Sequence, residues 1–217
     1  MDPRVLEDVT APGLMVMGAF QPSDGDGVPD AFGTLIMLGP SPDFWRVLQA
    51  APEGRDKAPD PVDRWSARVV GALADRVSGQ AFLPFGGPPY LPFLSWALKT
   101  GRAKSSPLGM LVHDRAGLLV SYRGAIAVVP KLHIPDPEQD TCTSCGTPCL
   151  TACPVGAFGQ QGYNTDVCHA HLDTPEGQDC LTRGCIARRA CPVSAGAGRV
   201  FEQSAHHMAY FHKATAS

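Results

Sequence analysis

The stretch Cys142-Thr-Ser-Cys145-Gly-Thr-Pro-Cys149-Leu-Thr-Ala-Cys153-Pro154 places four cysteines close together and ends in a Cys-Pro pair. A second group consists of Cys168 and then Cys180-x4-Cys185-x5-Cys191-Pro192, which again ends in Cys-Pro. These are all eight cysteines of the 217-residue chain, and none precedes Cys142. Thiolate chemistry is therefore confined to one span that follows a long cysteine-free region.

This spacing has a physical reason in cluster binding. Ligands a few residues apart let the chain wrap one corner of a metal cluster, and the proline after the last ligand turns the chain away. The layout is typical of two-cluster bacterial ferredoxins, in which three close cysteines hold one [4Fe–4S] cluster and the fourth binds the other. On that pattern the first cluster takes Cys142, Cys145, Cys149 and Cys191, and the second takes Cys153, Cys168, Cys180 and Cys185.

Several spacings are wider than the standard pattern, so the sequence leaves the exact pairing open. Other uses of eight cysteines agree less well with the sequence. Zinc sites usually present paired CxxC or Cys/His knuckles, whereas only Cys142 and Cys145 form a CxxC. Four disulfides would need an oxidising compartment. Cys168-His169-Ala170-His171 resembles half of a Rieske site, but the second half is missing, so these histidines are expected to be cluster neighbours.

Composition restricts the class of protein. The hydrophobic fraction of 44% is enough to form a core. The net charge of −3 provides no excess of positive charge for binding nucleic acid. No apolar run of about 20 residues indicates a membrane span. The start, MDPRVLEDVT, lacks the apolar region of a secretory signal. We therefore expect a cytoplasmic protein with no membrane and no nucleic-acid partner.

The segment His133-Ile134-Pro135-Asp136-Pro137 disfavours regular structure and predicts a division into domains 1–133 and 134–217. In the first domain, apolar runs between turn residues predict strands at 13–20, 33–38, 108–113, 117–122 and 125–129. Ser-Pro and Asp-Pro starts predict helices at 41–51 and 60–77, and a third helix is expected at 93–100. In the second domain, apolar residues at helical spacing over 200–211 predict a C-terminal packing helix. The fold class is therefore α+β, a sheet covered by helices followed by a small cluster-binding domain.

Three polar side chains of the first domain lie at predicted strand ends. His113 and Arg115 flank one turn, and Arg123 stands at the next junction. Arginine is suited to gripping a carboxylate or phosphate, although each of these arginines could equally be a solvated surface charge.

The segment Leu108-Gly-Met-Leu-Val-His113-Asp-Arg115-Ala-Gly117-Leu-Leu-Val-Ser-Tyr122-Arg123-Gly124-Ala resembles the signature hairpin of CblC-type cobalamin-processing proteins. Gly33-Thr-Leu-Ile-Met-Leu-Gly and Asp60-Pro-Val-Asp63-Arg-Trp resemble the same family in the same order. A hairpin of this kind followed by eight cysteines is similar to the order in epoxyqueuosine reductases and reductive dehalogenases. Because the sequence shows no counterpart of the acidic catalytic residue or of the C-terminal extension of epoxyqueuosine reductase, we do not expect epoxyqueuosine reduction itself.

The resemblance implies a nitroreductase-like domain fused to a bacterial-ferredoxin-like domain that carries two [4Fe–4S] clusters. It further implies an iron–sulfur oxidoreductase that passes electrons from a redox partner protein to cobalamin or to a small substrate held by the N-terminal domain. The side chains expected to face that corrinoid or substrate are His113, Arg115, Tyr122 and Arg123. The alternative is a ferredoxin-type electron carrier without catalytic activity, whose N-terminal domain docks a partner protein.

Overall fold

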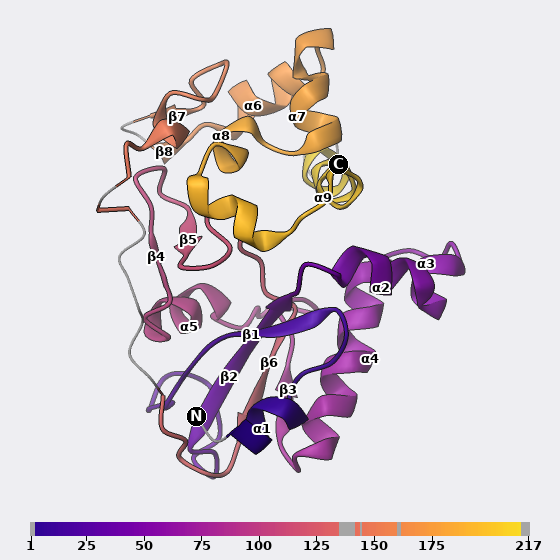
Figure 1. Ribbon diagram of the computed structural model, residues 1–217, viewed down its shortest axis with the longest axis vertical. Helices are drawn as coiled ribbons and strands as arrows, with labels where there is room; N and C mark the ends of the chain where they lie inside the picture. Colours follow the sequence, from indigo (N-terminus) through magenta and orange to yellow (C-terminus); the bar gives the residue numbers. More distant parts are fainter. Residues whose placement is uncertain (1–2, 135–141, 144, 160–161, 214–217) are drawn as a thin grey trace. The chain divides into compact units, whose positions relative to one another are not determined.

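The computed structural model describes residues 3–134, 142–143, 145–159 and 162–213. The chain divides into two compact units (Figure 1). The first contains residues 1–104 and 121–138, and the second contains residues 105–120 and 139–217. The predicted boundary near His133 and this division differ in one segment, because residues 105–120 belong to the cysteine-bearing unit.

A four-stranded antiparallel sheet forms the centre of the first unit, with the strand order β1-β2-β6-β3. The sheet consists of β1 (Leu14–Phe20), β2 (Thr34–Pro40), β3 (Gln80–Phe82) and β6 (Gly124–Val128). Helices α4 and α5 flank it in Figure 1. The helices of this unit are α1 (Pro3–Asp8), α2 (Phe44–Ala50), α3 (Pro52–Arg55), α4 (Pro61–Arg76) and α5 (Phe93–Lys99).

The core of this unit follows from the two periodicities in its sequence. Alternate β2 residues Ile36 and Leu38 meet apolar side chains of α2 and α4, among them Trp65. The Trp65 ring lies edge-on to Phe44, with ring centroids 5.2 Å apart. The mixed α+β class is therefore confirmed, as are the strands predicted at 13–20, 33–38 and 125–129 and the helices at 60–77 and 93–100.

The helix predicted at 41–51 is confirmed as α2, but its predicted start and the strand predicted at 117–122 are wrong. The helix predicted from Ser41 begins at Phe44, with Asp43 as its N-cap, because Ser41 and Pro42 form a preceding turn. The strand predicted at 117–122 does not form. Gly117 adopts a positive φ of 55°, and the N–H groups of Leu119 and Val120 close turns onto Ala116 and Gly117.

The second unit has short elements wrapped around its cysteines. Strand β4 (Ala103–Ser105) crosses the division between units, and β5 (Leu111–His113) follows it. Strands β7 (Phe158–Gly159) and β8 (Gly162–Tyr163) pair antiparallel. The helices are η1 (Pro148–Leu150), α6 (Thr165–Leu172), η2 (Pro175–Gly177), α7 (Gln178–Arg183), α8 (Ile186–Arg189), η3 (Pro192–Ala197) and α9 (Phe201–Lys213), so the predicted C-terminal helix is confirmed. None of the helices in the described ranges is long and apolar enough to cross a membrane.

Trp65 tests the assignment of the first unit's core. Its side chain is only 1% exposed, so Trp65→Ala should lower the free energy of unfolding by about 3–5 kcal/mol. Leu94→Ala, at a side chain 61% exposed, is the matched control and should change stability little. Denaturant unfolding of the whole chain followed by circular dichroism measures both. Equal stability of the two variants would contradict this core.

Candidate metal centre

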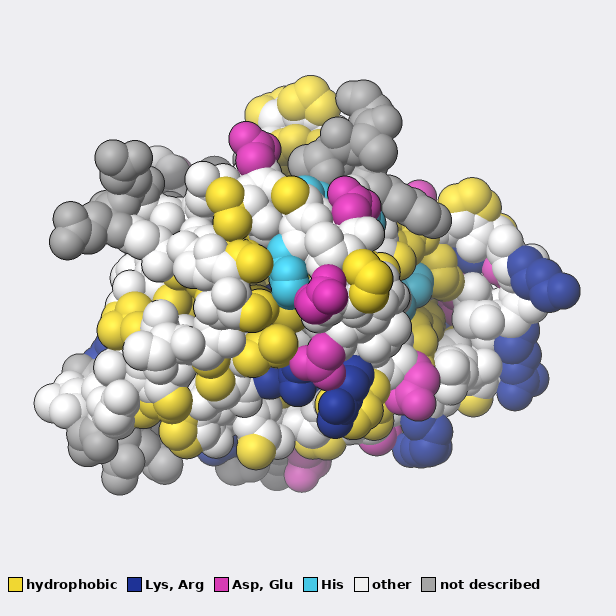
Figure 2. Space-filling model, turned by 90° about the horizontal axis from the view of Figure 1, so that it is seen from above, with side chains coloured by type: hydrophobic (Ala, Val, Ile, Leu, Met, Phe, Trp, Pro, Cys, Tyr) yellow, Lys and Arg dark blue, Asp and Glu magenta, His cyan; other side chains and the backbone are white. Residues whose placement is uncertain are grey.

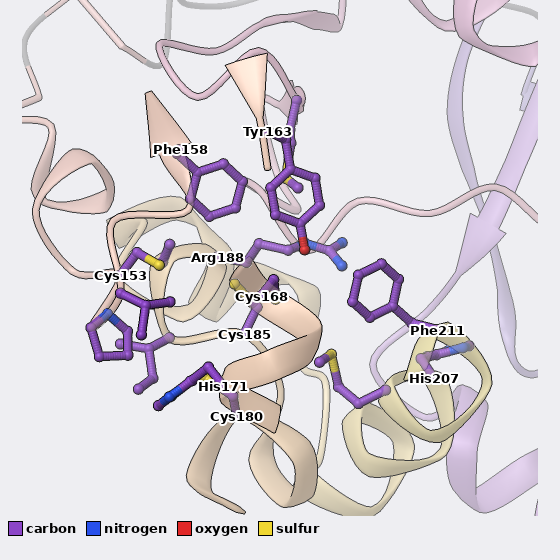
Figure 3. A pocket seen from close by; sticks show the side chains of 16 residues that line it. Cys153, Phe158, Tyr163, Cys168, His171, Cys180, Cys185, Arg188, His207 and Phe211 are labelled. Carbon is purple, nitrogen blue, oxygen red and sulfur yellow. The ribbon is translucent and has the colours of Figure 1, made fainter. Parts of the chain in front are cut away.

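Four cysteines line one pocket in the second unit. Its free volume is about 140 Å³, and Cys153, Cys168, Cys180 and Cys185 lie on its wall (Figure 3). They come from a turn after η1, from α6, from α7 and from the residue that precedes α8. These four are the cysteines that the sequence pattern assigned to the second cluster.

Local sequence features place these four residues. The Asn164 side chain caps α6 by accepting a hydrogen bond from the N–H of Val167, at 3.1 Å. Gly184 adopts a positive φ of 91° between Cys180 and Cys185, which lets α7 end and α8 begin after a sharp turn. The N–H group of Ala157 donates to Cys153 Sγ at 3.3 Å, and the backbone at Ile186 donates to the Cys180 sulfur. Backbone donors therefore already point at two of the sulfurs.

The other four cysteines form a second set. Cys149 and Cys191 are buried among Leu108, Val112, Leu118 and Ala187, and Cys142 packs against the same apolar cluster. Burial raises the pKa of the Cys149 thiol, and negative charge on Cys191, Cys145 and Cys142 raises it further. The structure thus brings Cys149 near the three cysteines that the pattern assigned to the first cluster.

Two thiols of the pocket have raised pKa values, as the Cys149 thiol does. Burial raises the pKa of Cys168 and of Cys180, and the neighbouring Cys185 adds to both shifts. Buried thiols of this kind are inert by themselves and become thiolates when a cation is bound to them. Both sets therefore fit a positively charged inorganic core. All eight cysteines are free of disulfides, so the disulfide alternative gains no support.

Within the described ranges, no three His, Cys, Asp or Glu side chains are grouped closely enough to hold a single metal ion. A tetrahedral zinc ion with Zn–S bonds of about 2.3 Å would bring its thiolates within about 3.8 Å of one another. A cubane instead binds each thiolate to a different iron and separates the sulfurs more widely.

Polar and aromatic side chains complete the pocket wall. Tyr163 donates a hydrogen bond from its hydroxyl group to the Cys168 sulfur, and burial together with this bond raises the tyrosine pKa. Burial lowers the pKa of Arg188, which also lines the pocket, and the nearby Cys185 and Tyr163 oppose that shift. Sequence reasoning missed both residues. Their only sequence signal is a place inside the cysteine span.

The histidines near the pocket have separate environments. His171 lines the pocket, and its Nε2 atom is buried without a hydrogen-bond partner. His169 instead lies beside His212, with the two Nδ1 atoms 3.1 Å apart, and His212 Nε2 lies 2.9 Å from an Asp173 carboxylate oxygen. His207, from the predicted C-terminal helix, also lines the pocket.

The four residues expected to face a corrinoid or substrate are divided between the units. His113 is fully buried, with Nδ1 accepting from the N–H of Arg115, and only the Arg115 side chain is exposed. In the first unit, Tyr122 is buried, and Arg123 lies 3.4 Å from Asp63 in an ion pair. Of the four residues, Arg115 is thus the one most accessible to a ligand.

Comparison with known proteins gives this chain no relatives: no family model matches it, and no curated protein matches it.

Residues 105–120 are fitted tightly onto the cysteine-bearing loops. A methyl group at Gly117 would lie 2.4 Å from the nitrogen of Ser194, and one at Gly196 would lie 2.2 Å from the carbonyl oxygen of Arg115. Both contacts fall within the second unit and hold this segment against η3, which follows Cys191. The segment is therefore part of the first cysteine set's surroundings.

Gly196→Ala tests this close fit. The added methyl group would collide with a backbone oxygen, so the second unit should lose about 1–3 kcal/mol of stability. Gly159→Ala adds the same group in open space and serves as the control. Thermal unfolding of both variants compares them, and an unchanged midpoint for Gly196→Ala would contradict the packing.

Proposed function

We propose that this protein is a cytoplasmic iron–sulfur redox protein whose second unit, a bacterial-ferredoxin-like domain, carries two [4Fe–4S] clusters. The observation that supports this most is the division of eight cysteines into two neighbouring sets of four. Cys153, Cys168, Cys180 and Cys185 share one pocket, while Cys142, Cys145 and Cys191 lie near Cys149. A reducing compartment keeps such thiols available for clusters.

The chain's own residues would perform three tasks in this protein. The cysteines would hold the clusters, and backbone N–H groups such as that of Ala157 would stabilise negative charge on sulfur. Apolar side chains such as Leu118 and Phe158 would keep water away from the metal sites. When bound, each [4Fe–4S] cluster supplies one-electron transfer.

The electrons would go to cobalamin or to a small substrate held by the N-terminal, nitroreductase-like region, residues 1–133, of which residues 105–120 belong to the second unit. This part of the proposal rests on the resemblance of the 108–125 segment to CblC-type hairpins and on the exposed position of Arg115. In such a protein the cysteines of the second unit would hold the clusters that carry electrons, and residues of the N-terminal region, Arg115 among them, would bind and orient the acceptor.

The second candidate is a simple electron carrier whose N-terminal region docks a redox partner protein. Figure 2 shows acidic side chains interspersed with hydrophobic and histidine side chains on one face. Since this face has no strong patch of a single charge, it does not favour docking onto a basic partner over the transfer of electrons to a small molecule.

Metal analysis tests the cluster assignment. Protein purified without oxygen should contain about eight iron and eight sulfide per chain. Cys180→Ser and Cys149→Ser should each remove about four iron, and electron paramagnetic resonance should show loss of a different signal in each variant. Thr151→Ala, an exposed residue between two proposed ligands, should keep all the iron. One zinc per cysteine set, or no metal, would overturn the proposal.

Anaerobic titration with hydroxocobalamin tests the acceptor. If the first candidate is right, dithionite-reduced protein freed of excess reductant should bind the corrinoid and convert it to cob(II)alamin, which has a distinct absorption spectrum. Arg115→Ala should weaken binding, because its side chain is exposed. Iron-loaded protein that neither binds nor reduces the corrinoid would leave the carrier function as the better explanation.

A further inference from the structure

The pocket of Cys153, Cys168, Cys180 and Cys185 contains a tyrosine held in one orientation. Tyr163 stacks on Phe158, with ring centroids 4.6 Å apart and ring planes within 14°. Phe211 lies beside its other side at 6.3 Å. In this position the Tyr163 hydroxyl group donates to the Cys168 sulfur. A hydroxyl hydrogen bond to a thiolate stabilises negative charge on that sulfur.

The same pocket contains a partly buried cation. Arg188 Nε donates to the carbonyl oxygen of Leu118 at 2.6 Å, and one terminal nitrogen lies 3.4 Å from the carbonyl oxygen of Val120. Among the described residues no carboxylate pairs with Arg188, and the groups that oppose the effect of burial on its pKa are the Cys185 sulfur and the Tyr163 hydroxyl group. Figure 3 shows its side chain extending toward the Tyr163 hydroxyl end. The charge of Arg188 is therefore available to the pocket.

The set around Cys149 has different surroundings. Within the described ranges its buried neighbours are Leu108, Val112, Leu118 and Ala187, with Met110, Phe158 and Val193 packed beside them. Cys153 and Cys185 of the pocket also pack against this cluster, so the two sets adjoin. Burial does not separate the two sets, because Cys149 is 6% exposed and Cys180 is 7% exposed. Asp179 lies near Cys180, but ion pairs with Arg183 and Arg189 offset its charge. Cations lie near both sets, because Arg189 and Arg199 line a hollow with Cys191. The main difference is thus the Tyr163 hydroxyl donor, which acts together with the Arg188 guanidinium that lines the pocket.

We propose that Tyr163 and Arg188 give the second cluster the higher reduction potential, so that the first electron taken up by the protein resides there. The inference rests on the proposed cluster function. An oxidised cubane with four thiolates carries a charge of about −2, and reduction adds one more negative charge. Positive charge and hydrogen bonds to sulfur stabilise the reduced form more than the oxidised form, which raises the potential.

In terms of electrons, a reduced first cluster loses one electron and an oxidised second cluster gains it, with no bond made or broken. An external one-electron reductant, dithionite in the test below, supplies that electron. Tyr163 and Arg188 are positioning residues in this scheme, because they set where the electron resides without exchanging electrons themselves.

Tyr163→Phe removes the hydroxyl group and keeps the stacked ring. Redox titration of the iron-loaded protein, followed by electron paramagnetic resonance, should show one of two potentials lowered and the other unchanged. We expect the equilibrium constant for electron sharing to fall at least about tenfold, or about 59 mV for one electron. Tyr210→Phe removes a hydroxyl group from a side chain 48% exposed on α9 and should shift neither potential.

Arg188→Met and Arg188→Lys separate charge from packing. Arg188→Met should lower the same reduction potential that Tyr163→Phe lowers. Arg188→Lys should lower it much less, because the cation remains. Iron content is measured in every variant, so a lost cluster is distinguished from a shifted one. If the R188M variant fails to assemble its clusters, the Tyr163→Phe variant still tests the inference. Equal shifts of both reduction potentials, or no shift in variants with full iron content, would overturn this inference. Wild-type protein without clusters would instead overturn the proposed function.

Discussion

Burial of eight thiols in a small unit is the constraint on which the second half of this structure depends. Its apolar clusters are built partly from cysteines: Cys149 and Cys191 belong to one, and Cys180 belongs to the other. The unit's helices are short, apart from α9, and the paired strands β7 and β8 have two residues each. Small units with limited cores usually need a disulfide or metal staple, so cluster assembly and folding of this unit are expected to be coupled.

The first unit needs no such support. A four-stranded sheet packed on α4 buries Trp65, Ile36 and Ile126 almost completely. The segment 105–120 nevertheless leaves this unit and joins the cysteine-bearing one. There Arg188 donates to the carbonyl oxygen of Leu118, and Arg199 donates to that of Leu119 at 2.9 Å. These side-chain donors replace the strand partner that would otherwise satisfy the backbone, which is why an apolar segment is not a strand here.

The same contacts explain what sequence reasoning could and could not reach. Apolar runs between turn residues predicted β1, β2 and β6, and Pro61 after Asp60 predicted the start of α4, because these signals are local. The grouping of the cysteines was also suggested by spacing alone. Gly117, Tyr163 and Arg188 acquire their roles from residues many positions away, such as Ser194, Cys168 and Leu118. Hydrophobic periodicity carries no information about contacts between residues so far apart in the sequence, so these contacts are visible only in the folded chain.

The charge of Arg188 also bears on whether the pocket binds a metal cluster. Removing a cation from water costs free energy unless negative charge or hydrogen bonds replace its hydration. Two backbone carbonyls satisfy part of the guanidinium, but carbonyls carry no net charge to balance it. The planar guanidinium group has several N–H donors, so it can donate to those carbonyls and still face the pocket. The single ammonium group of lysine would do both less well. A negatively charged cubane on the neighbouring cysteines would complete this balance, whereas four neutral thiols would leave the cation poorly compensated. This partly buried cation would thus be most stable if the pocket held an anionic cluster.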